Sequence, residues 1–329
     1  MDLAKLRQRS KIIRLIRQWF DERDFTEMHT PRLVALPGQE PYLEPFWTRV
    51  FEDDGRSHEA ALITSPEYAM KRLLAAGMDR IYDLGPCFRN HEPWDGTHDP
   101  EFLLLEWYRR NAGIDDLMRD TEDMLKFVSE NLTESAAAFQ YQEFRRLTVE
   151  QAWRQYVNIE LVDYLNDRQA LADLAEHQFE QTVTVEDDWD DVYFKIFLSY
   201  IEPRLGMEQP TFLYRYPVSQ ASLARRSADD PRWADRVELY AGGLELANGF
   251  AELSDADEQR RRFLDEQTLR QKNHKKTWPL DEKFLSVLPA MGNAAGIAFG
   301  VDRLVMLLTG AASINQVTPF SACERLLPE

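Results

Sequence analysis

The sequence predicts an α+β fold in which a mixed, mainly antiparallel β-sheet is flanked by helices. Strand-like segments occur in the first and last thirds of the 329-residue chain, and a long segment with helical periodicity separates them. The regular alternation of strands and helices that a doubly wound parallel sheet requires is missing. The length fits a single domain with an insertion. We therefore divide the chain into residues 1–112, a helical insertion at 113–210, and residues 211–329.

The N-terminal part is predicted to begin with a helix and a short strand. Apolar residues recur at helical spacing over residues 3–23. Residues 25–30 then have the character of a strand that stops at Pro31. Further along, Ser65 is placed to cap a helix whose first residue is Pro66.

Two apolar segments, 81–88 and 101–108, are predicted strands joined by a polar loop. Because side chains alternate across a strand, the second strand has one apolar face and one mixed face. The mixed face comprises Phe102, Leu104, Glu106 and Tyr108. An aromatic ring, a carboxylate and a phenol together suit a pocket wall, although an exposed sheet face would show the same pattern.

Residues 236–250 are typical of a β-hairpin, since two β-rich segments flank a Gly-Gly pair. A two-residue turn there would pair Tyr240 with Glu245 and Glu238 with Ala247. The two glutamates would then lie on one face, roughly 7–8 Å apart. At that separation they could share a divalent cation, but the same pair would also be ordinary on a solvated surface.

The last third contains two further predicted elements. Residues 256–276 read as an unusually basic helix, which would either contact an acidic partner or form a solvated face. Residues 296–308 predict a strand that runs into a helix, and Gly296 and Gly300 leave room for a flat ligand or another backbone. Arg303 lies at the start of this helix, where its guanidinium could hold a phosphate through two hydrogen bonds.

The composition narrows the class of protein. A net charge of −18 argues against a protein that grips nucleic acid, because such proteins neutralise phosphates with a basic face. Two cysteines are too few for a disulfide framework or a zinc ribbon. No run of about 18 apolar residues and no secretory signal is present. The sequence thus predicts a cytoplasmic protein without membrane contact.

Three ordered segments resemble the signature motifs of the class II aminoacyl-tRNA synthetases. Pro31 in HTPRLV matches motif 1, GPCFRN…DPEFLLLEWY (85–108) resembles motif 2, and GIAFGVDRLVML (296–307) resembles motif 3. The segments TSPEYAMKRLL and ELANGFAEL are similar to the lysyl-tRNA synthetases in particular. The resemblance implies the antiparallel catalytic core of that class, a homodimer, and activation of a lysine-like amino acid by ATP with Mg²⁺.

The resemblance also implies which residues form the site. Arg89 and Arg303 would bind the ATP phosphates as the catalytic residues, and Phe102 would stack on adenine. The set implied for ATP is Arg89, Asn90, His91, His98, Asp99, Phe102, Glu245, Leu246, Gly300 and Arg303. The set implied for the amino-acid substrate is Ser65, Pro66, Glu67, Glu106, Tyr108, Asn248, Glu252 and Ala298. Glu238 and Glu245 would coordinate Mg²⁺.

Three features depart from the lysyl-tRNA synthetase pattern. The family motif reads FRNE, whereas His91 stands fourth here and Glu92 follows, so either residue could take the glutamate's place near adenine. Ala298 replaces a family glycine, and its methyl group narrows the pocket beside the substrate α-carbon. No anticodon-binding β-barrel precedes the motif 1 segment, so tRNA binding is not expected.

These departures resemble the truncated lysyl-tRNA synthetase paralogues of bacteria. That resemblance implies (R)-β-lysine as the activated amino acid and a lysine ε-amine of elongation factor P as the acceptor. One alternative is a stand-alone enzyme that activates α-lysine for an RNA or carrier-protein acceptor. A second alternative is a non-catalytic regulator, which predicts loss of ATP- or metal-binding residues. Those residues are all present: Arg89, Phe102, Glu238, Glu245 and Arg303.

Overall fold

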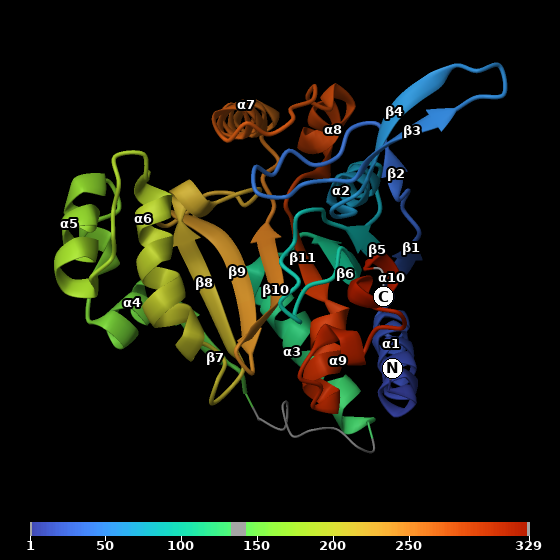
Figure 1. Ribbon diagram of the computed structural model, residues 1–329, viewed down its shortest axis with the longest axis horizontal. Coiled ribbons are helices and arrows are strands. Elements are labelled where there is room, and N and C mark those ends of the chain that lie inside the picture. The colour runs from blue at the N-terminus through green and yellow to red at the C-terminus, as the bar shows by residue number, and fades with distance from the viewer. Residues whose placement is uncertain (1, 133–142, 328–329) are drawn as a thin grey trace.

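An eight-stranded sheet forms the centre of the computed structural model, which describes residues 2–132 and 143–327 (Figure 1). In spatial order the strands are β1 (Thr26–Met28), β5 (Arg80–Phe88), β6 (Glu101–Arg110), β11 (Ala294–Gly300), β10 (Leu244–Ala251), β9 (Trp233–Ala241), β8 (Thr211–Pro217) and β7 (Arg145–Thr148). The two outermost pairs are parallel, and the six central strands pair antiparallel. The predicted α+β class with a mainly antiparallel sheet is confirmed.

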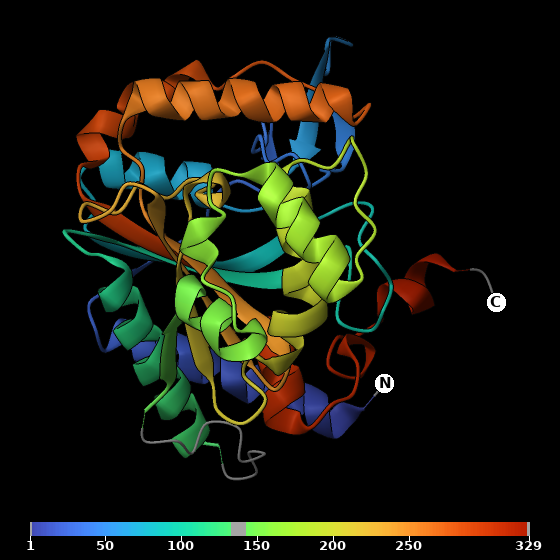
Figure 2. The same cartoon turned by 90° about the vertical axis from the view of Figure 1, so that its left-hand side faces the viewer.

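Helices cover both faces of the sheet, as Figure 2 shows from the side. One layer contains α1 (Leu3–Asp21), α3 (Ile114–Glu130) and α9 (Val301–Thr309), which pack on the main hydrophobic core. The opposite layer contains α2 (Glu67–Ala75), α7 (Ala256–Lys272) and α8 (Glu282–Met291), which enclose a smaller core. The functional groups described below lie between the sheet and this second layer.

Strand β6 shows the predicted alternation. Leu105 and Trp107 are fully buried in the main core with α1 and α3. Tyr108 belongs instead to the smaller core on the other face of the sheet, and Glu106 is 1% exposed there. The mixed face of this strand is therefore an interior wall and not a solvated surface.

The predicted helical insertion at 113–210 is only partly correct. Helix α3 packs under the central sheet, and β7 adds a strand beside β8. The separate helical layer contains α4 (Val149–Val157), η1 (Leu161–Asp163), α5 (Arg168–Phe179), α6 (Trp189–Ile196), η2 (Phe197–Ile201) and η3 (Glu202–Arg204). Its own apolar cluster, which includes Trp153 and Tyr193, packs against β8 and β9. The short β7 was missed because its strand pairing is non-local and leaves little periodicity in four residues.

The remaining elements lie at the edges of the molecule. A three-stranded sheet projects from the body in the order β2 (Leu33–Val34), β4 (Ser57–Leu62) and β3 (Trp47–Phe51) (Figure 1). Three short helices complete the chain: η4 (Val218–Gln220), η5 (Ile314–Gln316) and α10 (Ala322–Leu326). Within the described residues, no helix is long and apolar enough to cross a membrane.

The β9–β10 hairpin has the predicted turn but a different register. Both turn glycines have left-handed φ angles, and Tyr240 pairs with Glu245 as expected. A β-bulge between Glu245 and Ala247 then shifts the pairing by one residue, so Glu238 lies opposite Asn248 and not Ala247. The extra residue in β10 has no signature in the local sequence, which explains the error.

The basic segment 256–276 was predicted either to contact an acidic partner or to form a solvated face. Both interpretations are incomplete, because several of its cationic side chains contact other residues of this chain. Arg270 is fully buried, and it donates to the backbone oxygens of Glu40 and Leu43 and pairs with Glu44. Lys276 lies over the Trp47 ring. These contacts anchor the loop before β3 to the end of α7. Sequence periodicity could not reveal them, since the partners are more than 200 residues away.

Candidate active site

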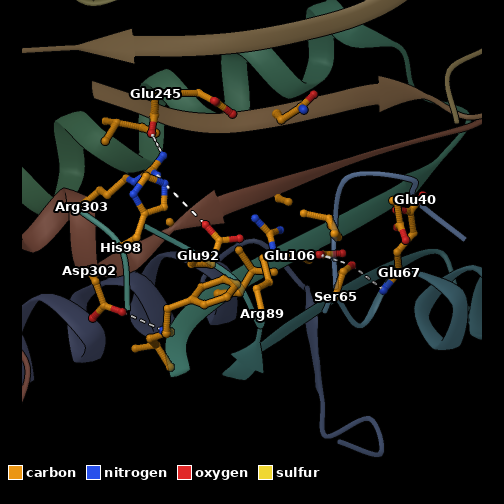
Figure 3. A pocket seen from close by; sticks show the side chains of 18 of the residues that line it. Glu40, Ser65, Glu67, Arg89, Glu92, His98, Glu106, Glu245, Asp302 and Arg303 are labelled. Atoms are coloured by element: carbon orange, nitrogen blue, oxygen red, sulfur yellow. Dashed lines mark hydrogen bonds and ion pairs between the residues drawn. The ribbon is translucent and has the colours of Figure 1, made fainter. Parts of the chain in front are cut away.

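A cavity opens between the sheet and the second helical layer, and Figure 3 shows its lining side chains. Residues from β6, β10, β11, α2 and the β5–β6 loop contribute to it. The predicted site residues that line it are Ser65, Glu67, Arg89, His98, Asp99, Phe102, Glu106, Glu245, Leu246, Asn248, Ala298, Gly300 and Arg303. Positions spread over 240 residues of sequence thus converge on one cavity.

One end of the cavity carries two arginines. The Arg89 guanidinium lies 4.9 Å from the centre of the Phe102 ring, and its buried Nε has no hydrogen-bond partner among the described residues. Arg303 donates from Nη1 to the backbone oxygen of Glu245 at 2.8 Å, which fixes the plane of its guanidinium. A buried hydrogen-bond donor without an acceptor is costly, and two cationic groups lie here, so this end is suited to an anionic ligand such as a phosphate or carboxylate.

His98 helps to orient Arg303. The Arg303 Nη2 group donates to Nε2 of His98 at 2.8 Å, so this imidazole nitrogen is the unprotonated acceptor. Nδ1 of the same ring lies 3.0 Å from the Asp95 carboxylate, to which it donates. Asp95 was not singled out from the sequence, because it lies in a loop without periodic pattern.

The structure places Glu92, and not His91, at the cavity. Glu92 is among the lining residues, and its carboxylate lies 3.8 Å from Nε2 of His98. His91 is exposed and has a left-handed φ of 61°. His91, which occupies the fourth position of the family motif FRNE, therefore faces solvent. The chain turns there, so that the side chain of Glu92 points into the cavity. This placement corrects the assignment of His91 to the ATP set.

Asp99 lines the cavity and Asn90 does not, and both side chains have partners within the protein. The Asp99 carboxylate accepts hydrogen bonds from the backbone amides of Glu101 and Ala322 and pairs with Arg325 at 3.0 Å. It therefore anchors the C-terminal segment beneath the cavity. Asn90 does not line the cavity, and its side-chain oxygen accepts from its neighbour's backbone amide. Both side chains support the β5–β6 loop, and their assignment to ATP stays a prediction.

The opposite end of the cavity carries carboxylates. Glu106 accepts a hydrogen bond of 2.6 Å from the Ser65 hydroxyl and one of 2.7 Å from the Tyr108 hydroxyl. Burial, and next the nearby Glu67 carboxylate, raise the pKa of Glu106 to about 8. Ser65 also accepts from the Glu67 amide at 3.0 Å, but α2 begins at Glu67 and its N-cap residue is Pro66, one residue later than predicted.

A buried lysine that was missed in the sequence joins two of these carboxylates. Lys71 lies one helical turn after Glu67 and forms ion pairs with Glu67 and, at 2.6 Å, with Glu252. Burial lowers the pKa of Lys71, but the Glu252 and Glu67 carboxylates outweigh it and the net shift is upward. Burial raises the pKa of Glu252, while Lys71 opposes that shift. The Glu67–Lys71 spacing of four residues was the available signal.

Glycine and alanine form the floor of the cavity on β11. Ala298 lies opposite Glu106 on β6 and Asn248 on β10. Gly300 lines the cavity, and a Cβ atom there would make only ordinary contacts, 3.7 Å from the Arg303 side chain and from the Leu246 carbonyl oxygen. Gly296 does not face a ligand, because a Cβ atom there would lie 2.1 Å from the Tyr108 ring. The room at Gly296 is therefore filled by the protein itself, which corrects the expectation of ligand approach at that position.

The two predicted metal carboxylates occupy different environments. Glu245 lines the cavity, and burial together with the nearby Glu238 carboxylate raises its pKa. Glu238 is 5% exposed, and it accepts hydrogen bonds from the Tyr216 and Tyr240 hydroxyls and pairs with Arg236. In the part of the chain that the structure describes, no three metal-ligand side chains cluster. Glu245 is thus the carboxylate available to a bound cation.

The pKa of Glu106 predicts a dependence of stability on pH. The carboxyl has an ordinary pKa of 4.5 when exposed and about 8 in the fold, so its stabilising effect is lost as the pH rises towards 8. Glu106→Gln removes this titration. Between pH 6 and pH 9 the free energy of unfolding should fall by about 2 to 3 kcal/mol less in the variant than in the wild type. Urea denaturation at both pH values measures the difference, and equal pH slopes would contradict the assignment.

The comparisons with known proteins agree with this geometry. The family described as tRNA synthetases class II (D, K and N) matches residues 3–324, so the chain belongs to this family of ATP-dependent amino-acid ligases. It is 39% identical over 322 residues to a protein of Proteus mirabilis (strain HI4320) named elongation factor P–(R)-β-lysine ligase. A protein of Haemophilus influenzae (strain PittGG) with the same name is 37% identical over 323 residues. Each alignment covers 97% of this chain and 95% of the relative.

Proposed function

We propose that this protein activates (R)-β-lysine with ATP and transfers the β-lysyl group to a lysine ε-amine of elongation factor P. The observation that carries the proposal is the division of one cavity into a cationic end, with Arg89 and Arg303, and an anionic end, with Glu67, Glu106 and Glu252 behind it. The first end is suited to phosphates and the second to a substrate with two ammonium groups. The names of the relatives supply the particular amino acid and acceptor.

The proposed reaction has two steps. The amino-acid carboxylate attacks the α-phosphorus of ATP, pyrophosphate leaves, and an acyl-adenylate forms. The neutral acceptor amine then attacks the carbonyl carbon, the amide bond forms, AMP leaves, and the amine proton passes to solvent. Arg89 and Arg303 stabilise the charge that develops on the phosphate oxygens, and catalysis is mainly positioning and electrostatic stabilisation. A carboxylate nucleophile needs no protein base.

We further propose Mg²⁺ as the metal, held by Glu245 and by phosphate oxygens of ATP. The donor set fits, because a partly buried carboxylate with a second carboxylate behind it favours a cation. When bound, Mg²⁺ would neutralise phosphate charge. Glu238 would add negative charge behind Glu245, since its own oxygens already accept from two tyrosines. A homodimer in the cytoplasm is the assembly and location that the synthetase resemblance implies, and sedimentation tests the dimer.

One experiment tests the proposed function. The protein is incubated with ATP and either (R)-β-lysine or α-lysine, together with elongation factor P or bulk tRNA. Each acceptor is then weighed by mass spectrometry. A β-lysyl mass increase on the factor supports the proposal. A strong preference for α-lysine or acylation of tRNA would favour the alternative ligase, and the absence of pyrophosphate exchange with either isomer would favour a non-catalytic protein.

Ala298 is expected to affect the choice of isomer. Its methyl group lies on the cavity floor between Glu106 and Asn248, so Ala298→Gly should widen the floor beside the substrate α-carbon. The ratio of kcat/KM for α-lysine to that for (R)-β-lysine should rise about 10-fold, the usual effect of one methyl group in a pocket. Pyrophosphate exchange measures both values. An unchanged ratio would rule out this role for Ala298.

A further inference from the structure

Glu40 lies at the carboxylate end of the same cavity and has no role in the family pattern described above. It belongs to the loop before β3 and lines the cavity beside Ser65 and Glu67, as Figure 3 shows. Its backbone is held firmly. The fully buried Arg270 donates to the Glu40 carbonyl at 2.9 Å, and the amide of the preceding residue donates to the Tyr68 hydroxyl.

The Glu40 carboxylate is confined, and its own backbone amide donates a hydrogen bond to it. In the described parts of the chain, no side chain forms a hydrogen bond or ion pair with its carboxylate. The carboxylate is folded over Gly38, where a Cβ atom would lie 2.1 Å from Oε2. The glycine therefore leaves room for the carboxylate at its present place in the cavity wall. An anchored, unpaired carboxylate in a cavity is suited to a cationic ligand group.

The neighbours of Glu40 indicate which ammonium group it faces. Its carboxylate lies within electrostatic range of Glu67, Lys71 and Arg89. Arg89 is proposed to bind the phosphate that the substrate carboxylate attacks, so an ammonium group close to that carboxylate would lie near Glu40. Glu252 interacts instead with Lys71, Glu67 and Glu106, at the other side of the carboxylate end.

We propose that Glu40 is a specificity-determining residue that binds, together with Glu67, the amino group nearest the substrate carboxylate. This inference rests on the proposed function and adds a residue to it. With Glu40 beside Glu67, an ammonium group can be neutralised at more than one position along the cavity wall. The site can therefore accept an amino group that is displaced by one carbon along the substrate chain. Glu106 and Glu252 would then bind the other ammonium group, at the far end of the substrate chain.

Ligand binding without turnover tests the proposal. The dissociation constants of (R)-β-lysine and of 6-aminohexanoic acid, which lacks the proximal amine, are measured by calorimetry for the wild type and for Glu40→Gln. The variant should bind (R)-β-lysine about 10- to 100-fold more weakly, the effect of one charged hydrogen bond. Its affinity for 6-aminohexanoic acid should change less than about 3-fold.

Two further variants separate ligand binding from loop structure. Gly38→Ala keeps the charge of Glu40 but displaces its carboxylate, so it should show the same selective loss. Glu160→Gln makes the identical substitution at an exposed ion pair with Arg154, in the separate helical layer, and should change neither constant. Equal weakening of both ligands by Glu40→Gln would show a merely structural role, and unchanged binding of (R)-β-lysine would also overturn the proposal. Pyrophosphate exchange by the wild type tests the proposed function independently.

Discussion

Arg303→Ala is expected to lower the rate of ATP–pyrophosphate exchange by at least about 10³-fold, the magnitude found when an arginine that stabilises a phosphoryl transition state is removed. The structure supports such a role because two interactions fix the guanidinium before any ligand binds. One is the hydrogen bond to the Glu245 carbonyl, and the other is the hydrogen bond to the neutral imidazole of His98. A preorganised cation stabilises developing charge without reorganisation during the reaction.

Three variants complete this experiment. Arg303→Lys should recover only a small part of the rate, since an ammonium group cannot reproduce the planar arrangement of donors. His98→Ala leaves the charge but removes the orienting acceptor, so its loss should be intermediate. Arg260→Ala removes an exposed ion pair with Glu282 and should leave exchange unchanged. If Arg303→Ala retains a rate within about 10-fold of the wild type, the phosphate-binding role of Arg303 is wrong.

The sequence predicted best those features that depend on local pattern. The alternation in β6 correctly separated the core face of Trp107 from the interior face of Glu106, because strand geometry has a strict period of two. The predicted turn of the β9–β10 hairpin was also correct, because its Gly-Gly pair allows left-handed backbone angles. The motif resemblance then placed arginines and carboxylates in one cavity, although they lie far apart in the chain.

The features that were missed depend on contacts between distant segments. The bulge after Glu245 changed the partner of Glu238, and nothing in either strand alone requires that extra residue. His91 and Glu92 could not be distinguished until the path of the loop was known. Lys71 and Arg270 appeared as ordinary charges on helices, yet both are buried because carboxylates and carbonyl groups from other elements surround them. A buried charge is defined by its partners, and sequence periodicity does not show those partners.

Lys71→Met is expected to raise the KM for the amino acid at least about 100-fold at pH 7, because we propose that the substrate's distal ammonium group is bound by the ionised form of Glu252. The Lys71 ammonium counteracts the effect of burial on Glu252, whose pKa is about 8 in the intact site. Without Lys71 that pKa should rise further, so the ionised fraction of Glu252 at pH 7, already a minority, should become much smaller. The KM should therefore fall as the pH increases towards 9, whereas the wild-type KM should vary less over the same range.

The pH dependence distinguishes this positioning role from a general loss of folding. Removing one partner of a buried ion pair costs about 3 to 5 kcal/mol of stability, so urea denaturation must accompany the kinetics. The double variant Lys71→Met with Glu252→Gln removes both charges and should regain part of the stability. Its KM should remain high at every pH, since no carboxylate is left to ionise. A single variant whose KM rises equally at pH 7 and pH 9 would show that Lys71 only supports the fold, because a structural defect does not depend on the protonation of Glu252.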